Sequence, residues 1–177
     1  MADSPDSPDL PDIPRPSQLW KQLSPEKKRL AADSFWRDEH ANTEQAEAIH
    51  LIAQRIKFRV KSVVAMPVEK KSHYVLAMPA ISETMAARLL VAYHLDHQRP
   101  MMGAFLDALG VKHEDGIIAE DEVAPPSPDA LTKAAKAIAA SYPSEDVSLY
   151  LSTLVWQDPD TWGPLAELPE TKSVVGS

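Results

Sequence analysis

The chain has 177 residues, 44% of them hydrophobic, and a formal net charge of −8, which is typical of one globular domain, alone or with a tail. The absence of cysteine excludes disulfides, thiolate-held metals and a cysteine nucleophile, and it favours a reducing compartment, so we predict a cytoplasmic location. Only 5 glycines occur, both common nucleotide-binding fingerprints are missing, and no apolar run reaches the ~18 residues of a membrane span. We therefore predict no cofactor and no membrane association.

The first sixteen residues form an acidic, proline-rich segment. Prolines and aspartates recur there at intervals of about three residues, which is the repeat of a polyproline II helix. Leu10 and Ile13 are the main apolar side chains, so little burial is available to offset the loss of chain entropy. We predict that residues 1–16 are a disordered tail. They lack the basic and apolar regions of a secretory signal.

Helix signals dominate the rest of the chain. Ser24-Pro25-Glu26 and Ser127-Pro128-Asp129 each combine a hydroxyl N-cap, a proline at the first helical position and an acid near the positive end of the dipole. Pro67 and Gly110 are typical of helix ends. A short amphipathic turn follows Ser17, and the predicted helices cover residues 24–37, 44–65, 68–78, 82–97, 101–109, 127–141 and 144–154, before a last turn near 156–162.

The predicted helix over 44–65 has two apolar faces, which favours a central position in the fold. Its main apolar stripe spans about 100° and consists of Ile49, Ile52, Ala53, Ile56, Val60 and Val63. Leu51 and Phe58 form a second, narrower patch on the far side. Four basic residues flank the stripe and are the candidate partner-binding residues: Arg55, Lys57, Arg59 and Lys61.

The fold class that these patterns predict is all-α, a compact bundle of about seven to nine helices. We expect a single helical domain over 17–170, a loop near 111–129 and a frayed end at 171–177. Ile117-Ile118 could be briefly extended, but we predict no sheet because a single strand has nothing to pair with. The similarity of 86–109 to 134–154 could reflect HEAT-like helical hairpins, but alanine and leucine recur in any helical protein, so we favour chance similarity.

Charge is distributed unevenly along the chain. Residues 17–105 carry 13 basic and 9 acidic groups, a balance of +4, whereas residues 106–177 carry 4 basic and 13 acidic groups, a balance of −9. These opposite balances favour a protein partner or self-association. Nucleic acid is disfavoured as a partner, because neutralisation of phosphates drives that affinity.

A metal site is the main catalytic alternative. Glu47-Ala-Ile-His50 has the Glu-x-x-His spacing of di-iron helical bundles, and His94-Leu-Asp-His97 offers two imidazoles on another helix. If Glu47, His50, His94 and His97 converged, they could hold one ion. A second Glu-x-x-His copy is missing from the sequence, so we commit to no metal ligand.

A third interpretation is an apolar pocket for a small ligand. Met85, Met101, Met102 and Phe105 could line such a pocket, since methionine adapts to irregular apolar surfaces. The interpretation that we favour is a non-enzymatic helical protein that acts by protein–protein interaction, as an adaptor, regulator or assembly component. The alternatives are the metal-dependent enzyme and the apolar-ligand binder.

Overall fold

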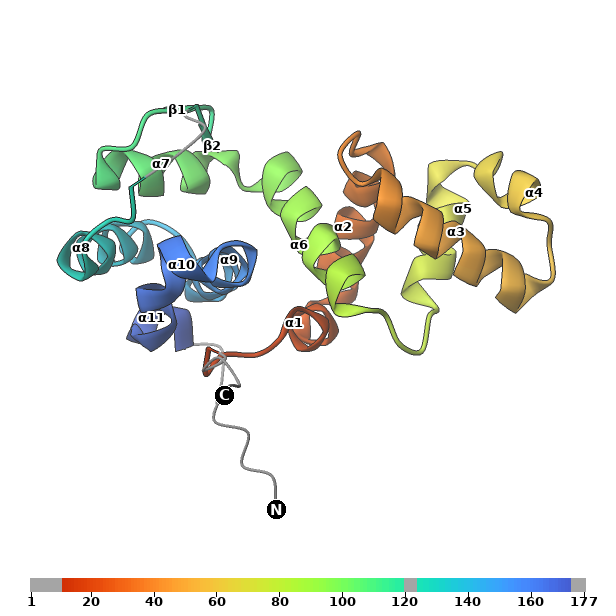
Figure 1. The fold of residues 1–177 in the computed structure, drawn as a ribbon, viewed down its shortest axis with the longest axis horizontal. Coiled ribbons are helices and arrows are strands. Elements are labelled where there is room, and N and C mark those ends of the chain that lie inside the picture. The colour runs from red at the N-terminus through yellow and green to blue at the C-terminus, as the bar shows by residue number, and fades with distance from the viewer. Residues whose placement is uncertain (1–10, 120–123, 173–177) are drawn as a thin grey trace, which may run out of the picture.

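The computed structural model describes residues 11–119 and 124–172, and it confirms the all-α fold class. Figure 1 shows an elongated molecule in which one long helix, α6, crosses the middle. Eleven α-helices, one 3-10 helix and one two-stranded sheet occur within the described residues: α1 (Pro16–Gln22), α2 (Pro25–Arg37), α3 (Asn42–Ile56), α4 (Val60–Val64), α5 (Val68–Leu76), α6 (Glu83–His97), α7 (Arg99–Leu109), β1 (His113–Glu114), β2 (Ile117–Ile118), α8 (Pro128–Ala139), α9 (Ser144–Gln157), α10 (Pro159–Trp162), η1 (Gly163–Glu167) and α11 (Pro169–Lys172).

Serine N-caps begin three of the long helices. Ser24 accepts a hydrogen bond from the Lys27 backbone N–H at the start of α2. Ser82 and Ser127 do the same for the third residue after each of them, at α6 and α8. These contacts confirm the predicted helix starts, because each serine oxygen satisfies a backbone donor that has no partner within the helix.

The predicted continuous helix over 44–65 is wrong, because α3 ends at Ile56. Lys57 adopts a left-handed conformation with φ of 58°, and the Phe58 N–H donates to the Ala53 carbonyl at 3.0 Å. This bond is the wider of the two that close a Schellman-type helix end. The short helix α4 then runs in a new direction, so Val63 is buried whereas Val60 is 40% exposed.

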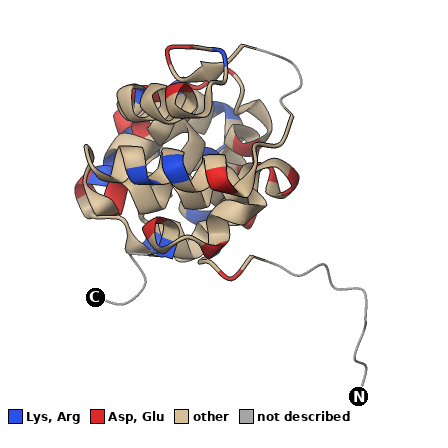
Figure 2. Ribbon diagram, turned by 90° about the vertical axis from the view of Figure 1, so that its left-hand side faces the viewer, with Lys and Arg blue, Asp and Glu red and all other residues tan. Residues whose placement is uncertain are grey.

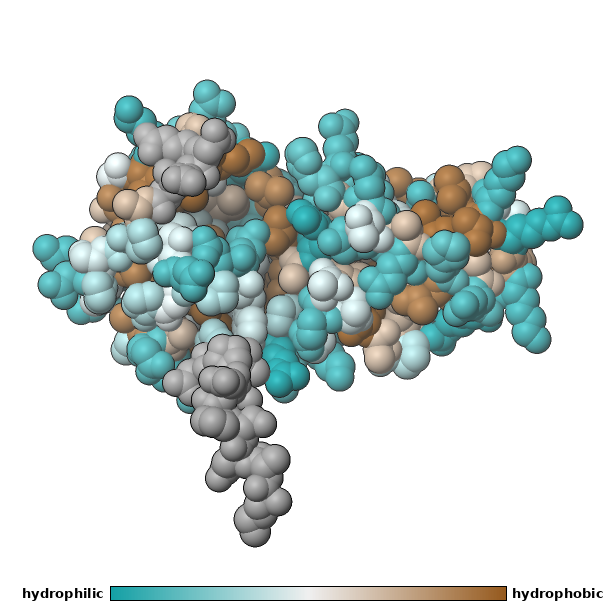
Figure 3. Space-filling model, viewed as in Figure 1, coloured by the Kyte–Doolittle hydropathy of each residue, from teal (hydrophilic) through white to brown (hydrophobic). Residues whose placement is uncertain are grey.

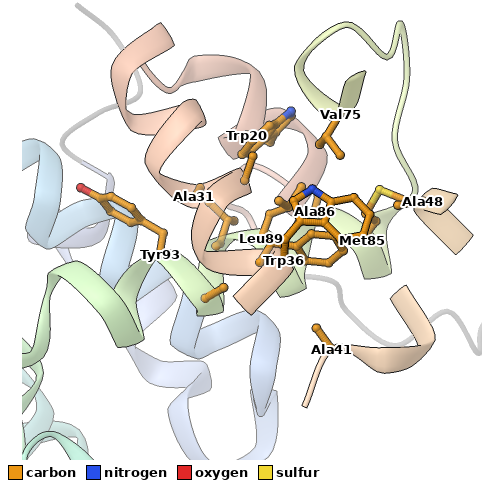
Figure 4. Close-up of a cluster of buried hydrophobic side chains, with 14 of the residues drawn as sticks. Trp20, Ala31, Trp36, Ala41, Ala48, Val75, Met85, Ala86, Leu89 and Tyr93 are labelled. Atoms are coloured by element: carbon orange, nitrogen blue, oxygen red, sulfur yellow. The ribbon is translucent and has the colours of Figure 1, made fainter. Parts of the chain in front are cut away.

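Two hydrophobic clusters make up the core. The first lies among α1–α6 and includes Trp20, Phe35, Met85 and Leu89, of which Figure 4 labels three. The second lies mainly among α7, α8 and α9 and the turns after α9. Trp156 on α9 packs against both clusters, so it joins the two halves of the core.

Small side chains bring α2 and α6 close together in the first cluster. Ala31 and Ala32 on α2 and Ala86 on α6 are completely buried. Alanine at a helix contact allows the two axes to approach at the short end of the usual 8–10 Å range. Figure 4 shows Ala31 and Ala86 between the large side chains of the same cluster.

The segment before α1 packs on the fold, which corrects the predicted tail over 1–16. Ile13 is 9% exposed and belongs to the second cluster, and the Trp156 Nε1–H donates to the Pro14 carbonyl at 2.8 Å. Pro16 already belongs to α1. Burial of Ile13 and this hydrogen bond order residues 11–16, whereas residues 1–10 lie outside the described part of the chain.

The end of the described chain is similarly packed. Thr171 in α11 is buried, and its carbonyl accepts a hydrogen bond from the Ser148 hydroxyl at 2.5 Å. The prediction of a frayed end from residue 171 is therefore wrong for residues 171 and 172. Residues 173–177 lie outside the described residues.

A small β-hairpin occupies part of the predicted loop near 111–129. β1 and β2 pair antiparallel, with His113 opposite Ile118, so the expectation of no sheet is wrong. The turn residues Asp115 and Gly116 have φ of 51° and 86°. Asp-Gly is a preferred pair for a two-residue hairpin turn in which both central residues have positive φ. The partner strand of Ile117-Ile118 is therefore the nearby segment His113-Glu114.

The suggested HEAT-like relation between 86–109 and 134–154 stays a sequence prediction. Within the described chain, α7 packs mainly on α8, which belongs to the other half of the suggested repeat. Figure 1 shows α6 and α7 pointing away from each other rather than folding back side by side. No helix of the described residues is long and apolar enough to cross a membrane.

Candidate functional site

The four metal candidates do not form one site. Within residues 11–119 and 124–172, no group of three or more His, Asp and Glu side chains is arranged to hold a metal ion. Glu47 accepts a hydrogen bond from the Ser82 hydroxyl at 3.3 Å, whereas His50 is exposed on α3. His97 lies 3.3 Å from the Ser34 hydroxyl. The Glu-x-x-His spacing places Glu47 and His50 one helical turn apart, but it does not show which side chains of other helices lie beside them.

His94 is the buried member of this set and has an unusual environment. Its side chain is 3% exposed and its ring lies 5.5 Å from the Tyr150 ring, centroid to centroid. The Nδ1 atom is 2.7 Å from the Leu90 carbonyl, and a carbonyl can only accept, so Nδ1 carries the proton. Burial lowers the pKa of His94 to about 4, so the ring is neutral at pH 7.

The other ring nitrogen of His94 has no hydrogen-bond partner among the described residues. In the neutral ring Nε2 is a hydrogen-bond acceptor, and it is buried without a hydrogen bond to any described residue. Most buried polar atoms in folded proteins have a partner, so an exception of this kind calls for an explanation.

A pocket lies beside His94, between α6, α7, α9 and the hairpin. Its cavity volume is about 240 Å³. Its wall is mostly apolar: Val91, Leu95, Met102, Leu106, Gly116, Ile117, Ile118, Leu154 and Trp162, with His94, Tyr150, Thr153 and Gln157 as the polar or amphipathic members. A largely apolar pocket with a few polar groups is the usual form of a small-molecule site.

The hairpin is fastened to α7 beside this pocket. The Gly116 N–H donates to His113 Nδ1 at 3.0 Å, so the neutral His113 ring carries its proton on Nε2, which lies 2.6 Å from an Asp107 carboxylate oxygen. Arg99 Nη1 donates to the Asp115 carbonyl at 3.2 Å. These bonds connect both sides of the Asp-Gly turn to α7, so the hairpin forms a fixed wall of the pocket.

Most of the residues predicted to line an apolar pocket lie instead in the hydrophobic core. Met85, Met101 and Phe105 are completely buried and belong to the two hydrophobic clusters. Met102 is the one member of the four that also lines the pocket beside His94. Part of the wall comes from α9 and the turn after it, which are about fifty residues away in sequence, so no local pattern could have indicated that part.

A second candidate lies at the far end of the molecule, around the break between α3 and α4. Four of the seven exposed large hydrophobic side chains in the described chain lie within residues 51–64. Phe58 and Val64 are 51% and 53% exposed. We call these residues and the four basic ones among them the distal surface: Leu51, Phe58, Val60 and Val64 with Arg55, Lys57, Arg59 and Lys61.

The basic members of the distal surface are free in the described chain. All four are exposed, and none has an ion pair with a described residue. Figure 3 shows hydrophobic and hydrophilic side chains next to each other over this end of the molecule. Exposed apolar side chains that gather in one region, bordered by polar ones, mark interaction sites in soluble proteins.

The opposite end of the molecule carries mixed charge. Figure 2 faces that end and shows lysine and arginine interspersed with aspartate and glutamate on its helices. In this view, the face of the molecule is not uniformly acidic.

No protein-family model, curated protein or solved structure matches the chain. The class of this protein is therefore described from its fold and its two candidate sites alone. It is an all-helical protein with a small, mostly apolar pocket between α6, α7, α9 and the hairpin and an exposed apolar–basic surface at one end.

Proposed function

We propose that the protein acts by protein–protein interaction, and that its distal surface binds an acidic segment of a partner that also carries large apolar side chains. The observation that carries the proposal is the gathering of exposed large hydrophobic residues with four basic residues that have no ion pair in the described chain. The absence of cysteine is consistent with the cytoplasm as the place of this interaction.

The chemistry of the distal surface defines the partner. Phe58 and Val64 are about half exposed, so covering them would remove apolar area from water. Arg55, Lys57, Arg59 and Lys61 would attract carboxylates and speed the encounter. A short acidic helix with apolar residues at helical spacing supplies both kinds of contact.

A protein partner is favoured over a lipid surface or nucleic acid. The exposed apolar residues come from the end of α3, the loop after it and the short α4, whereas a membrane-binding helix presents one long apolar face. The formal charge of −8 opposes binding to a polyanion over the whole molecule. We therefore treat vesicle or nucleic-acid binding as outcomes that contradict the proposal.

The test uses a fluorescent synthetic peptide with Glu and Asp on one face and Leu and Phe on the other. Fluorescence anisotropy measures its affinity for the full chain. We expect saturable binding that weakens about tenfold or more in Phe58→Ser/Val64→Ser and in Arg55→Glu/Lys61→Glu. A second peptide with Ser in place of Leu and Phe is expected to bind much more weakly.

Matched control variants change the same residue types elsewhere. Lys133→Glu/Lys136→Glu reverses two exposed charges on α8, and Leu30→Ser removes an exposed leucine of α2. Both are expected to leave the affinity within about twofold. Equal binding of the two peptides, equal loss in the control variants, or preferential binding to phosphatidylserine vesicles or to single-stranded DNA would contradict the proposal.

A further inference from the structure

We propose that the pocket beside His94 is a binding site for a small, neutral, mainly aromatic or aliphatic molecule that carries one hydroxyl group. In the complex the hydroxyl would donate a hydrogen bond to His94 Nε2. This inference is independent of the distal surface, because the pocket lies at the other side of α6, among different residues.

The volume of the pocket defines the size of the ligand. An engineered cavity of about 150 Å³ in another protein binds benzene. The pocket beside His94 has about 240 Å³, so a molecule of two fused rings fits. Ile117 is 45% exposed and Gln157 is also exposed, so the pocket has an entrance between the hairpin and the end of α9.

The unpaired nitrogen of His94 defines the polar group of the ligand. The Leu90 carbonyl fixes the proton on Nδ1, so Nε2 can only accept. The ring is held by the carbonyl on one side and by the Tyr93 and Tyr150 rings at 5.4 and 5.5 Å. His94 is one of the side chains that line the pocket, and a ligand hydroxyl that reached Nε2 after a small shift of the wall would satisfy a nitrogen that is buried without a partner among the described residues.

The charge of the pocket excludes ionic ligands. None of the described residues that line it is Lys, Arg, Asp or Glu. Burial raises the pKa of Tyr150, so this side chain is also neutral at pH 7. An anion or a cation would lose its hydration in this pocket without a charged partner, and that loss is costly.

His94 Nε2 differs from the other polar side-chain atoms of the wall because it is a buried acceptor without a described partner. The Thr153 hydroxyl donates to the Leu149 carbonyl at 2.7 Å, within its own helix. Gln157 is exposed at the last turn of α9. Among the side chains that line the pocket, His94 alone has a buried polar atom without a described partner, and a single hydroxyl on an apolar body matches it.

The test compares two probes that differ at one group. 2-Naphthol carries a hydroxyl where 2-methylnaphthalene carries a methyl group of similar size. Both are titrated into the ¹⁵N-labelled full chain, and the affinity and the shifted backbone signals are recorded by NMR. We expect 2-naphthol to bind with the larger shifts at residues of α6, α7, α9 and the hairpin, and to move the His94 Nε2 signal in the direction of an accepted hydrogen bond.

Variants separate the hydrogen bond from the shape of the pocket. His94→Leu is expected to weaken 2-naphthol about tenfold while leaving 2-methylnaphthalene nearly unchanged. His94→Gln, which keeps an acceptor, is expected to recover part of the 2-naphthol affinity. Val91→Phe fills the pocket from α6 and is expected to abolish binding of both probes. Circular dichroism checks that each variant remains folded.

Several outcomes would overturn the proposal. No saturable binding of 2-naphthol to the unmodified chain would do so, as would shifts that map to other surfaces. An equal affinity of the two probes would show that His94 Nε2 takes no part. A 2-naphthol affinity that His94→Leu leaves unchanged would show the same, even if the pocket is occupied.

Discussion

Lys57 holds a backbone conformation that favours glycine. With φ of 58° it ends α3 and turns the chain toward α4. A left-handed conformation costs a residue with a Cβ atom about 1–2 kcal/mol, which glycine avoids. Lys57→Gly is therefore expected to raise the free energy of unfolding by about 1 kcal/mol, measured by urea denaturation.

A glycine in the helix that follows gives the opposite expectation. Lys61 is an exposed residue of α4, and Lys61→Gly is expected to lower the free energy of unfolding by about 1 kcal/mol. Equal effects of the two substitutions would contradict the structure of the turn.

His94 gives the protein a specific dependence of stability on pH. Its pKa is about 4 in the folded state and about 6.5 in an unfolded chain, because burial disfavours the charged ring. The unfolded chain thus binds more protons between these values, so stability falls as the pH falls from about 6.5 to 4. The loss from this residue reaches about 3 kcal/mol at the lower limit.

Urea denaturation at a series of pH values measures this effect. We expect His94→Leu to lose this part of the pH dependence, whereas His50→Leu, at an exposed position, retains it. A His94→Leu profile parallel to that of the unmodified chain would show that His94 is not buried as a neutral ring.

The position of the β-hairpin on α7 depends on Gly116. A Cβ atom on Gly116 would lie 2.8 Å from the Met102 Cβ and 3.0 Å from the Arg99 carbonyl oxygen, and φ is 86°. We expect Gly116→Ala to displace the hairpin from α7 and to lower the free energy of unfolding by about 2 kcal/mol. Thermal unfolding and NMR signals of β1 and β2 measure the two effects.

Gly163 is a matched control for this substitution. A Cβ atom there meets nothing within 4 Å of the described structure, and the backbone is right-handed helical. Gly163→Ala is expected to leave stability unchanged or to raise it slightly. A Gly116→Ala variant as stable as Gly163→Ala would contradict the close packing of the hairpin on α7.

The helix starts with a serine N-cap were predictable because each depends on a few adjacent residues, as Ser24 and Ser82 show. The start of α1 was not, since this helix begins at Pro16 and not after Ser17. The end of α3 was not, since Lys57 carries no sequence signal for a left-handed conformation and the apolar stripe continues past it. The hairpin had a signal in Asp115-Gly116, which the pairing argument overlooked. To predict the pocket, one would have to know that α6 and α9 lie side by side. The local patterns of a single sequence do not show which distant helices pack together.

At the scale of the whole molecule, Trp156 connects the two halves of the core. It packs against both hydrophobic clusters and holds the segment before α1 through its bond to the Pro14 carbonyl. We expect Trp156→Ala to lower the free energy of unfolding by about 3 kcal/mol. Phe58→Ala, at an aromatic residue that is 51% exposed, is expected to change it by less than about 0.5 kcal/mol.

The same comparison bears on the distal surface. If Phe58 were part of the core, its removal would cost as much as that of Trp156, and it would not be free to bind a partner. Comparable losses in urea denaturation would therefore contradict the exposure on which the proposed interaction depends.

The most direct test of the account is a map of where the acidic, apolar peptide binds. The ¹⁵N-labelled full chain is titrated with this peptide, and backbone NMR shifts are followed to saturation. The account predicts that the largest shifts fall within residues 51–64 and that Phe58→Ser/Val64→Ser removes them. Shifts centred on another surface, or no saturable shift, would contradict it.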